Sequence, residues 1–201
     1  MKLVILSSAS VNEPHRTPYD HLAKNGRWEV HIVAPESISI GSGRRKPCDP
    51  RRPDAGYRLH LAPLIGESGG GRFSLFGSLA RTLRAIRPDI VFAEQDPASV
   101  AVLQAKALAP RAKCVAFTVE NIQHHRWSDA LRALAERRPK AALRDVAVGS
   151  LTAAGEATVD GLACISNEGR RIFLAAGWRK PLEVVPLGTD TTAFCPRDAG
   201  D

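Results

Sequence analysis

The stretch Asp160–Pro186, DGLACISNEGRRIFLAAGWRKPLEVVP, contains one complete strand–helix–strand unit. Residues 161–165 form a short apolar run, which is typical of a buried strand. Asn167 then supplies an N-cap for a helix, and Gly177 closes that helix. A second apolar run, at residues 182–186, follows after a short connection. Because two neighbouring strands joined through a helix lie parallel, this unit predicts a parallel sheet.

The same alternation extends upstream to the beginning of the chain. We expect further strands at residues 3–6, 28–34, 57–61, 90–93 and 114–118. Helical patterns are expected at residues 17–25, 74–86, 97–108 and 128–158, the last with a break near Gly149. This order predicts an α/β protein, a single Rossmann-like domain with a mostly parallel sheet of about six or seven strands and helices on both faces. We expect Gly41–Gly56, which is rich in arginine, and the extreme C-terminus to be unstructured.

Composition and charge limit the class of protein. The 201 residues are 44% hydrophobic and 24% charged, which suits a globular fold rather than disorder. A net charge of +7 favours anionic partners: phosphate-bearing ligands, acidic lipid headgroups or nucleic acid. Nucleic acid is the least favoured, because aromatic residues make up only 5% and no recognition motif is found. No apolar run approaches the ~20 residues that cross a bilayer.

The four cysteines do not form a metal motif. Cys48, Cys114, Cys164 and Cys195 are widely spaced, without a CxxC pair or a Cys/His cluster, so we expect no zinc site. Cys114 and Cys164 lie in apolar runs and are interpreted as buried hydrophobic residues. This usage fits a reducing cytoplasm.

The first candidate binding loop follows the first strand. In open α/β sheets, ligands bind beyond the carboxyl ends of the strands. His15 and Arg16 precede a helix there, where positive charge favours an anionic ligand. A solvated loop with an arginine salt bridge is the alternative. Neither the G-x-G-x-x-G fingerprint nor the P-loop pattern is present, so dinucleotide binding and P-loop phosphate binding are poorly supported.

Two further loops carry titratable residues. Glu120 and Asn121 follow the fifth strand directly, where they would act as a general base or orient a hydroxyl, unless they only cap a turn. Glu94 and Gln95 after the fourth strand are similar and weaker candidates. His124 is followed by a second histidine, and adjacent side chains point in different directions, which disfavours a shared metal.

The C-terminal motifs carry a family resemblance. The segments are Asp160–Ser166, Leu174–Gly177, Val184–Asp190 and Phe194–Pro196. Together they are similar to the family 4 glycosyltransferases of the GT-B type, in which a strand runs into Val-Pro-Asn-Gly-Val-Asp before Phe-x-Pro. Leu187 replaces the usual asparagine and Thr189 the usual valine. The earlier segments Pro14–Tyr19, Arg87–Val91 and Phe117–Ile122 agree in order and spacing, although the Gly-Gly pair after the first strand is missing.

The resemblance implies half of an enzyme. Residues 1–186 would be the N-terminal acceptor-side domain and residues 187–201 the start of an interdomain linker, with the C-terminal donor-binding domain absent. The full enzyme would be a retaining transferase that moves a sugar from a nucleotide sugar to a hydroxyl acceptor, a glycan or lipid-linked glycan as in polysaccharide biosynthesis. No metal or cofactor is expected beyond that donor. The chain alone is expected to be inactive.

The resemblance also assigns site residues. Glu120 is the catalytic candidate. The substrate-binding candidates are His15, Arg16, Tyr19, Glu94, Gln95, Asn121 and His124. Gly188 and Asp190 fall in the interdomain connection near the donor.

Location and class leave alternatives open. We expect a cytoplasmic protein, and the basic charge and arginine-rich segment suggest peripheral contact with an acidic inner membrane face through an anionic or lipid-linked acceptor. The alternative class is a free-standing α/β binding or scaffold domain for an anionic ligand.

Overall fold

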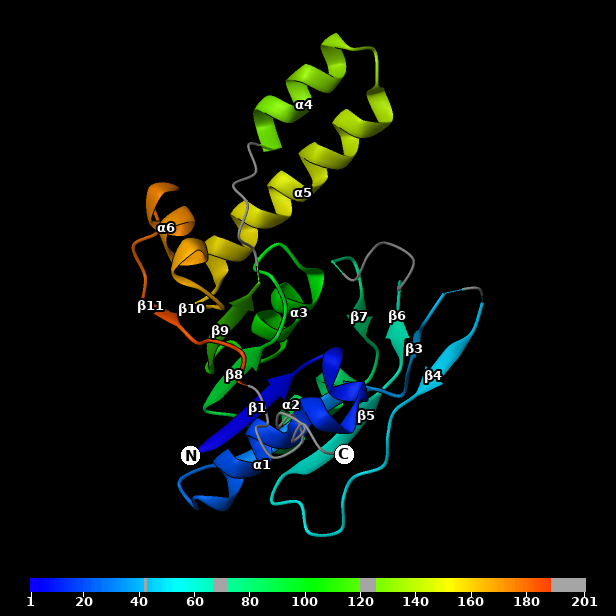
Figure 1. The fold of residues 1–201 in the computed structure, drawn as a ribbon, viewed down its shortest axis with the longest axis vertical. Helices are drawn as coiled ribbons and strands as arrows, with labels where there is room; N and C mark the ends of the chain where they lie inside the picture. Colours follow the sequence, from blue (N-terminus) through cyan, green and yellow to red (C-terminus); the bar gives the residue numbers. More distant parts are fainter. Residues whose placement is uncertain (42, 67–71, 120–125, 189–201) are drawn as a thin grey trace, which may run out of the picture.

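A computed structural model describes residues 1–41, 43–66, 72–119 and 126–188, and it contains one seven-stranded parallel sheet (Figure 1). The strand order is β11-β10-β9-β8-β1-β2-β5. The strands are β1 (Lys2–Leu6), β2 (Glu29–Pro35), β5 (Arg58–Ala62), β8 (Ile90–Ala93), β9 (Lys113–Thr118), β10 (Gly161–Cys164) and β11 (Leu182–Val184). The predicted Rossmann-like α/β fold is confirmed.

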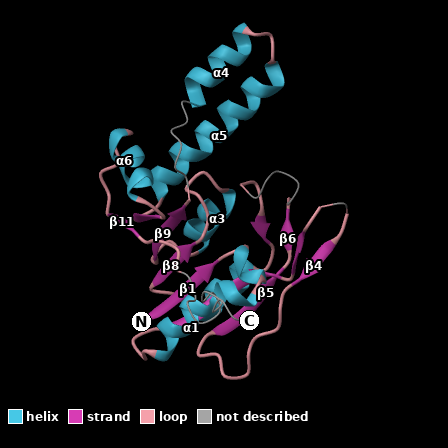
Figure 2. Ribbon diagram, in the orientation of Figure 1, coloured by secondary structure: helices cyan, strands magenta, loops and turns pink. Residues whose placement is uncertain are grey.

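Helices cover both faces of this sheet (Figure 2). The helices of the described residues are α1 (Thr17–Lys24), α2 (Leu79–Ile86), α3 (Val100–Leu108), α4 (Arg126–Ala135), α5 (Pro139–Thr158) and α6 (Asn167–Ala175). Of these, α4 packs on α5 and lies away from the sheet. Side chains alternate between the two faces of a strand. Leu3 and Ile5 of β1 therefore join the core that packs under α1, whereas Val4 and Leu6 join the core shared with α2, α3 and α6.

The chain reverses its direction of travel across the sheet at β1. It runs outward from β1 to β2 and β5, and then returns to place β8 on the other side of β1. The register pairs Leu6 of β1 with Val33 of β2 and with Ala93 of β8. In open α/β sheets, ligands bind at the carboxyl edge beside such a topological switch point.

The helix expected at residues 74–86 begins later, at Leu79. Leu75 and Phe76 instead form β7, which pairs antiparallel with β6 (Leu64–Ile65). The Gln104 side chain of α3 bonds both backbone groups of Phe76, donating to its carbonyl at 2.9 Å and accepting from its N–H at 3.0 Å. This distant side chain fixes an extended conformation that the local helical period does not reveal.

The helical segment 128–158 does break, but not at Gly149. The structure has two helices, α4 and α5, and Gly149 lies buried within α5. Arg137 takes a left-handed conformation with φ of 56° between them, and Pro139 opens α5. Proline suits the first turn of a helix because the N–H that it lacks would have no partner there. The predicted position of the break was therefore wrong.

The arginine-rich segment expected to be unstructured is folded where the structure describes it. Two short strands, β3 (Ser37–Ser39) and β4 (Arg45–Pro47), form an antiparallel pair. Arg51 donates to the carbonyls of Tyr57 and Ala55, and Arg52 forms ion pairs with Glu13 and Asp20. The cations therefore hold the segment against the body of the protein.

Candidate functional site

The candidate site lies at the switch point between β1 and β8. Two backbone bonds extend the sheet beyond the strands: the Ser7 N–H donates to the Val33 carbonyl at 3.1 Å, and the Glu94 N–H donates to the Leu6 carbonyl at 2.9 Å. The Gln95 side-chain amide then donates to the Ser8 hydroxyl at 3.1 Å. The loops after β1 and β8 are thus joined directly at the carboxyl edge.

Tyr19 and Glu94 form the central contact of this site. Tyr19 lies in the first turn of α1, which Pro18 helps to open, and its hydroxyl donates to Glu94 Oε1. Burial, followed by the negative charge of Glu94, raises the pKa of Tyr19, so the phenol remains a donor at neutral pH. Glu94 Oε2 is buried and has no hydrogen-bond partner among the residues that the structure describes. Tyr19 therefore holds one carboxylate oxygen, and no described residue donates to the other.

Asp96 extends the site towards β9, and sequence analysis did not select it. The Thr118 hydroxyl at the end of β9 donates to Asp96 Oδ1 at 2.5 Å, and Arg72 Nη2 lies 3.6 Å from Asp96 Oδ2. Its position directly after Glu94 and Gln95 was a usable signal. The pairing with Thr118 was not predictable without knowing that β8 and β9 are neighbours.

Arg16 was expected to face an anionic ligand, but its side chain points into the protein. Its side chain is fully buried, and Nη2 donates to the carbonyls of Asp49 at 2.9 Å and Pro50 at 3.2 Å. The Asp49 carboxylate accepts from the Glu13 N–H at 2.9 Å, and that bond is the main cause of its lowered pKa. Arg16 therefore joins the loop after β1 to the segment that follows β4.

The remaining site residues from the sequence analysis are scattered or lie outside the description. His15 is exposed on the short 3₁₀ turn before α1, and Gly188 is exposed beyond β11. Glu120, Asn121, His124 and Asp190 lie outside the described residues. The structure thus brings together Tyr19, Glu94 and Gln95, with Ser8 as a further member.

The described residues contain neither a metal-binding cluster nor a helix that could span a membrane. Within the four described ranges, no group of three or more His, Cys, Asp or Glu side chains is arranged to hold a metal ion. The helices in those ranges are all too short or too polar to cross a membrane.

The sequence of the chain matches a known protein family. The Glycosyl transferase 4-like domain matches residues 19–188, and the chain belongs to this family. The match begins at Tyr19 of the site and ends at Gly188. A comparison with curated proteins finds no match.

Solved structures with a similar fold have little sequence in common with the chain. The UDP-GlcNAc 2-epimerase from Methanocaldococcus jannaschii is 12% identical with a TM-score of 0.47, covering 94% of this chain and 46% of its own. The sucrose-phosphate synthase from Thermosynechococcus elongatus is 10% identical with a TM-score of 0.49, and the match covers 98% of this chain and 50% of the synthase. A UDP-glucosyltransferase from Polygonum tinctorium is 14% identical with a TM-score of 0.43, and the match covers 94% of this chain and 52% of the glucosyltransferase. The chain spans about half the length of these proteins.

Proposed function

We propose that this chain is the acceptor-side domain of an enzyme that transfers a sugar from a nucleotide-sugar donor to a hydroxyl acceptor, a glycan or lipid-linked glycan. Membership of the Glycosyl transferase 4-like family supports sugar transfer. The observation that carries the acceptor role is the Glu94 carboxylate at the switch point, with one oxygen bound by Tyr19 and the other buried without a donor from the described residues.

The chemistry of this carboxylate suits a sugar hydroxyl. A hydroxyl donates to an ionised carboxylate in a charge-assisted bond, which is shorter and stronger than a neutral one. Tyr19 fixes the orientation of Glu94, so less conformational entropy is lost when an acceptor binds. Gln95, bonded to Ser8, adds an amide beside the same loop. Together these groups would orient an acceptor hydroxyl at the carboxyl edge of the sheet.

The remaining roles follow from the resemblance and complete the proposal. Glu120, two residues after Thr118, would act on the acceptor hydroxyl, with Asn121 and His124 as further contacts. Gly188 and Asp190 would connect this domain to a donor-binding domain that holds the nucleotide sugar. We propose transfer with retention and without a metal ion, in the cytoplasm. Since the donor would bind elsewhere, the 201-residue chain alone would not catalyse transfer.

Acceptor binding tests the proposal directly. The chain would be applied to a glycan array, and the strongest ligand would be measured by titration calorimetry. We expect Glu94→Gln to weaken that ligand by roughly tenfold or more, because the neutral amide loses a charge-assisted bond. Glu183→Gln is the matched control, since Glu183 is exposed on the edge strand β11 and distant in the sheet from β8.

Two outcomes would contradict the proposal. If Glu94→Gln and Glu183→Gln bind glycan equally well, the switch-point carboxylate is not an acceptor contact. Sugar transfer by the 201-residue chain, measured with nucleotide sugars and that glycan, would refute the claim that this chain is inactive alone.

A further inference from the structure

The α4–α5 hairpin projects away from the sheet and its covering helices (Figure 1). The two helices pack on each other through small buried side chains, among them Ala130 and Ala133 of α4 and Ala142 of α5. The C-terminal part of α5 is fixed to the body where Gly155 lies against the Pro97 carbonyl. The distal part of the hairpin therefore extends from a firmly seated base.

One side of this hairpin carries large exposed aliphatic side chains. Leu131 is 69% exposed, Leu134 56%, Leu143 72% and Val146 38%. The first two belong to α4 and the last two to α5. The two residues of each helix are three positions apart, so they lie on one face of that helix. We call these four residues the aliphatic row.

The two pairs lie on the same side of the hairpin. Each residue of the aliphatic row directly follows a buried residue of its own helix, Ala130 and Ala133 in α4 and Ala142 and Asp145 in α5. Successive helical residues rotate by about 100°. The rotation from the buried residues to the row is therefore the same in α4 and α5. Because the helices run antiparallel, equal rotations bring both pairs to one side, which creates a continuous apolar strip.

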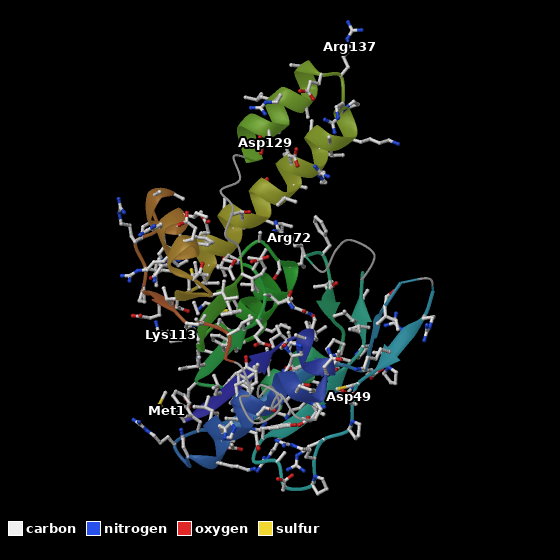
Figure 3. All side chains as sticks on the ribbon, in the orientation of Figure 1. Met1, Asp49, Arg72, Lys113, Asp129 and Arg137 are labelled. Atoms are coloured by element: carbon white, nitrogen blue, oxygen red, sulfur yellow. The ribbon has the colours of Figure 1, made fainter. Side chains whose placement is uncertain are left out.

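The tip of the hairpin is basic. Within residues 131–146, five cationic residues outnumber the two acidic ones, Glu136 and Asp145. The cationic residues are Arg132, Arg137, Arg138, Lys140 and Arg144. All five are exposed. Figure 3 shows the Arg137 side chain at the very end of the hairpin, pointing away from the body (Figure 3).

We propose that the α4–α5 hairpin docks on an acidic lipid bilayer, with the aliphatic row in the interface and the cations of the tip on the headgroups. An amphipathic helical surface binds a membrane through apolar area and through attraction to anionic lipids, and this hairpin offers both. The arginine-rich segment after β3 is a poorer contact, because Arg51 and Arg52 hold it against the body of the protein. The ion pairs of the tip, Arg138 with Glu136 and Arg144 with Asp145, join residues within the tip itself. The docking does not depend on sugar transfer.

Vesicle flotation with the 201-residue chain tests this docking. We expect binding to phosphatidylcholine vesicles that contain phosphatidylserine, and little binding to phosphatidylcholine alone. Arg137→Glu with Arg138→Glu should weaken binding by roughly tenfold or more, since each cation near an acidic surface contributes about 1 kcal/mol. The charge-matched control is Arg81→Glu with Arg84→Glu, two exposed positions on α2.

The apolar contribution needs its own pair of variants. Leu131→Gln with Leu143→Gln should also reduce flotation, whereas Leu174→Gln with Leu187→Gln, exposed outside the hairpin, should not. Circular dichroism checks that each variant folds. Equal binding to both vesicle types would overturn the proposal, and so would an equal loss of vesicle binding in the hairpin variants and their controls. A third contrary outcome is a chain that does not float with vesicles and instead forms a dimer, which dissociates only in the Leu131→Gln, Leu143→Gln variant. The last outcome would assign the aliphatic row to a second copy of the chain.

Discussion

At the scale of single residues, the hydroxyls of two tyrosines in the core under α1 provide a matched pair. Tyr19 donates to Glu94, whereas the buried Tyr57 hydroxyl has no partner in the described part of the chain. We expect Tyr19→Phe to lower the free energy of unfolding by about 1–3 kcal/mol, because a hydrogen bond to a charged group is lost. Tyr57→Phe should be neutral or stabilising, because it removes a polar atom that is not compensated. Urea unfolding of both variants measures the difference, and equal losses would contradict the Tyr19–Glu94 contact.

A histidine pair should make stability depend on pH. His31 Nδ1 lies 3.0 Å from His60 Nε2 on neighbouring strands, and Glu29, Arg58 and Lys2 face the pair. Burial is the main cause that lowers the pKa of both rings. The unfolded chain therefore binds protons more readily than the folded one, and stability present above pH ~6.5 is lost as the pH falls through the lowered pKa values.

Urea unfolding between roughly pH 8 and pH 5 checks this prediction, because the usual pKa of histidine lies within that range. Replacing both rings, by His31→Gln with His60→Gln, should flatten the profile. His21→Gln serves as the control, because His21 is exposed on α1. An unchanged slope in the double variant would show that the pair does not govern the acid sensitivity.

The candidate site was predictable only in part, for a reason that acts at this scale. Glu94 and Gln95 could be selected because they follow an apolar run, and the carboxyl ends of such strands share one edge. Tyr19 was selected only through the family resemblance. Their partners could not, because the Ser8–Gln95 and Thr118–Asp96 bonds depend on the order of strands in the sheet. Arg16 shows the same limit, since its acceptors are backbone carbonyls of a segment remote in sequence.

At the scale of elements, the strands were easier to predict than the helix ends. Buried parallel strands are continuous apolar runs, and each predicted run coincides with a strand of the sheet. The ends of helices depend on single residues and on distant contacts. Pro139 begins α5 after the turn at Arg137, and Gln104 of α3 holds Phe76 outside α2. Such contacts have no periodic signature.

The seat of α5 on the body gives a prediction for a whole element. A Cβ added to Gly155 would lie 1.8 Å from the Pro97 carbonyl oxygen, which is closer than atoms can approach. Gly155→Ala should therefore displace α5 and lower the free energy of unfolding by about 1–3 kcal/mol or more. Gly188→Ala is the control, because a Cβ there meets nothing within 4 Å. Thermal denaturation of the two variants compares them, and an undiminished Gly155→Ala melting temperature would contradict this packing.

At the scale of the whole molecule, the two cores share one sheet and should unfold together. Ile5 faces the core under α1 and Leu6 faces the core under α2, α3 and α6, yet they are consecutive residues of β1. One core cannot be lost without displacing the strand that supports the other. We therefore expect a single cooperative transition, as is usual for a domain of this kind.

Two tryptophans can report on the cores separately. Trp28 packs against the core under α1, and Trp178 belongs to the other core, against Phe173 of α6. In a Trp127→Phe background, adding Trp178→Phe leaves Trp28 as the probe, and adding Trp28→Phe leaves Trp178. Since each replacement also changes stability, circular dichroism of the same variant supplies the reference midpoint. Fluorescence and circular dichroism should coincide in both variants, because β1 couples the cores. A Trp28 midpoint separated from its own circular dichroism midpoint would mean that the α1 side opens independently of the sheet.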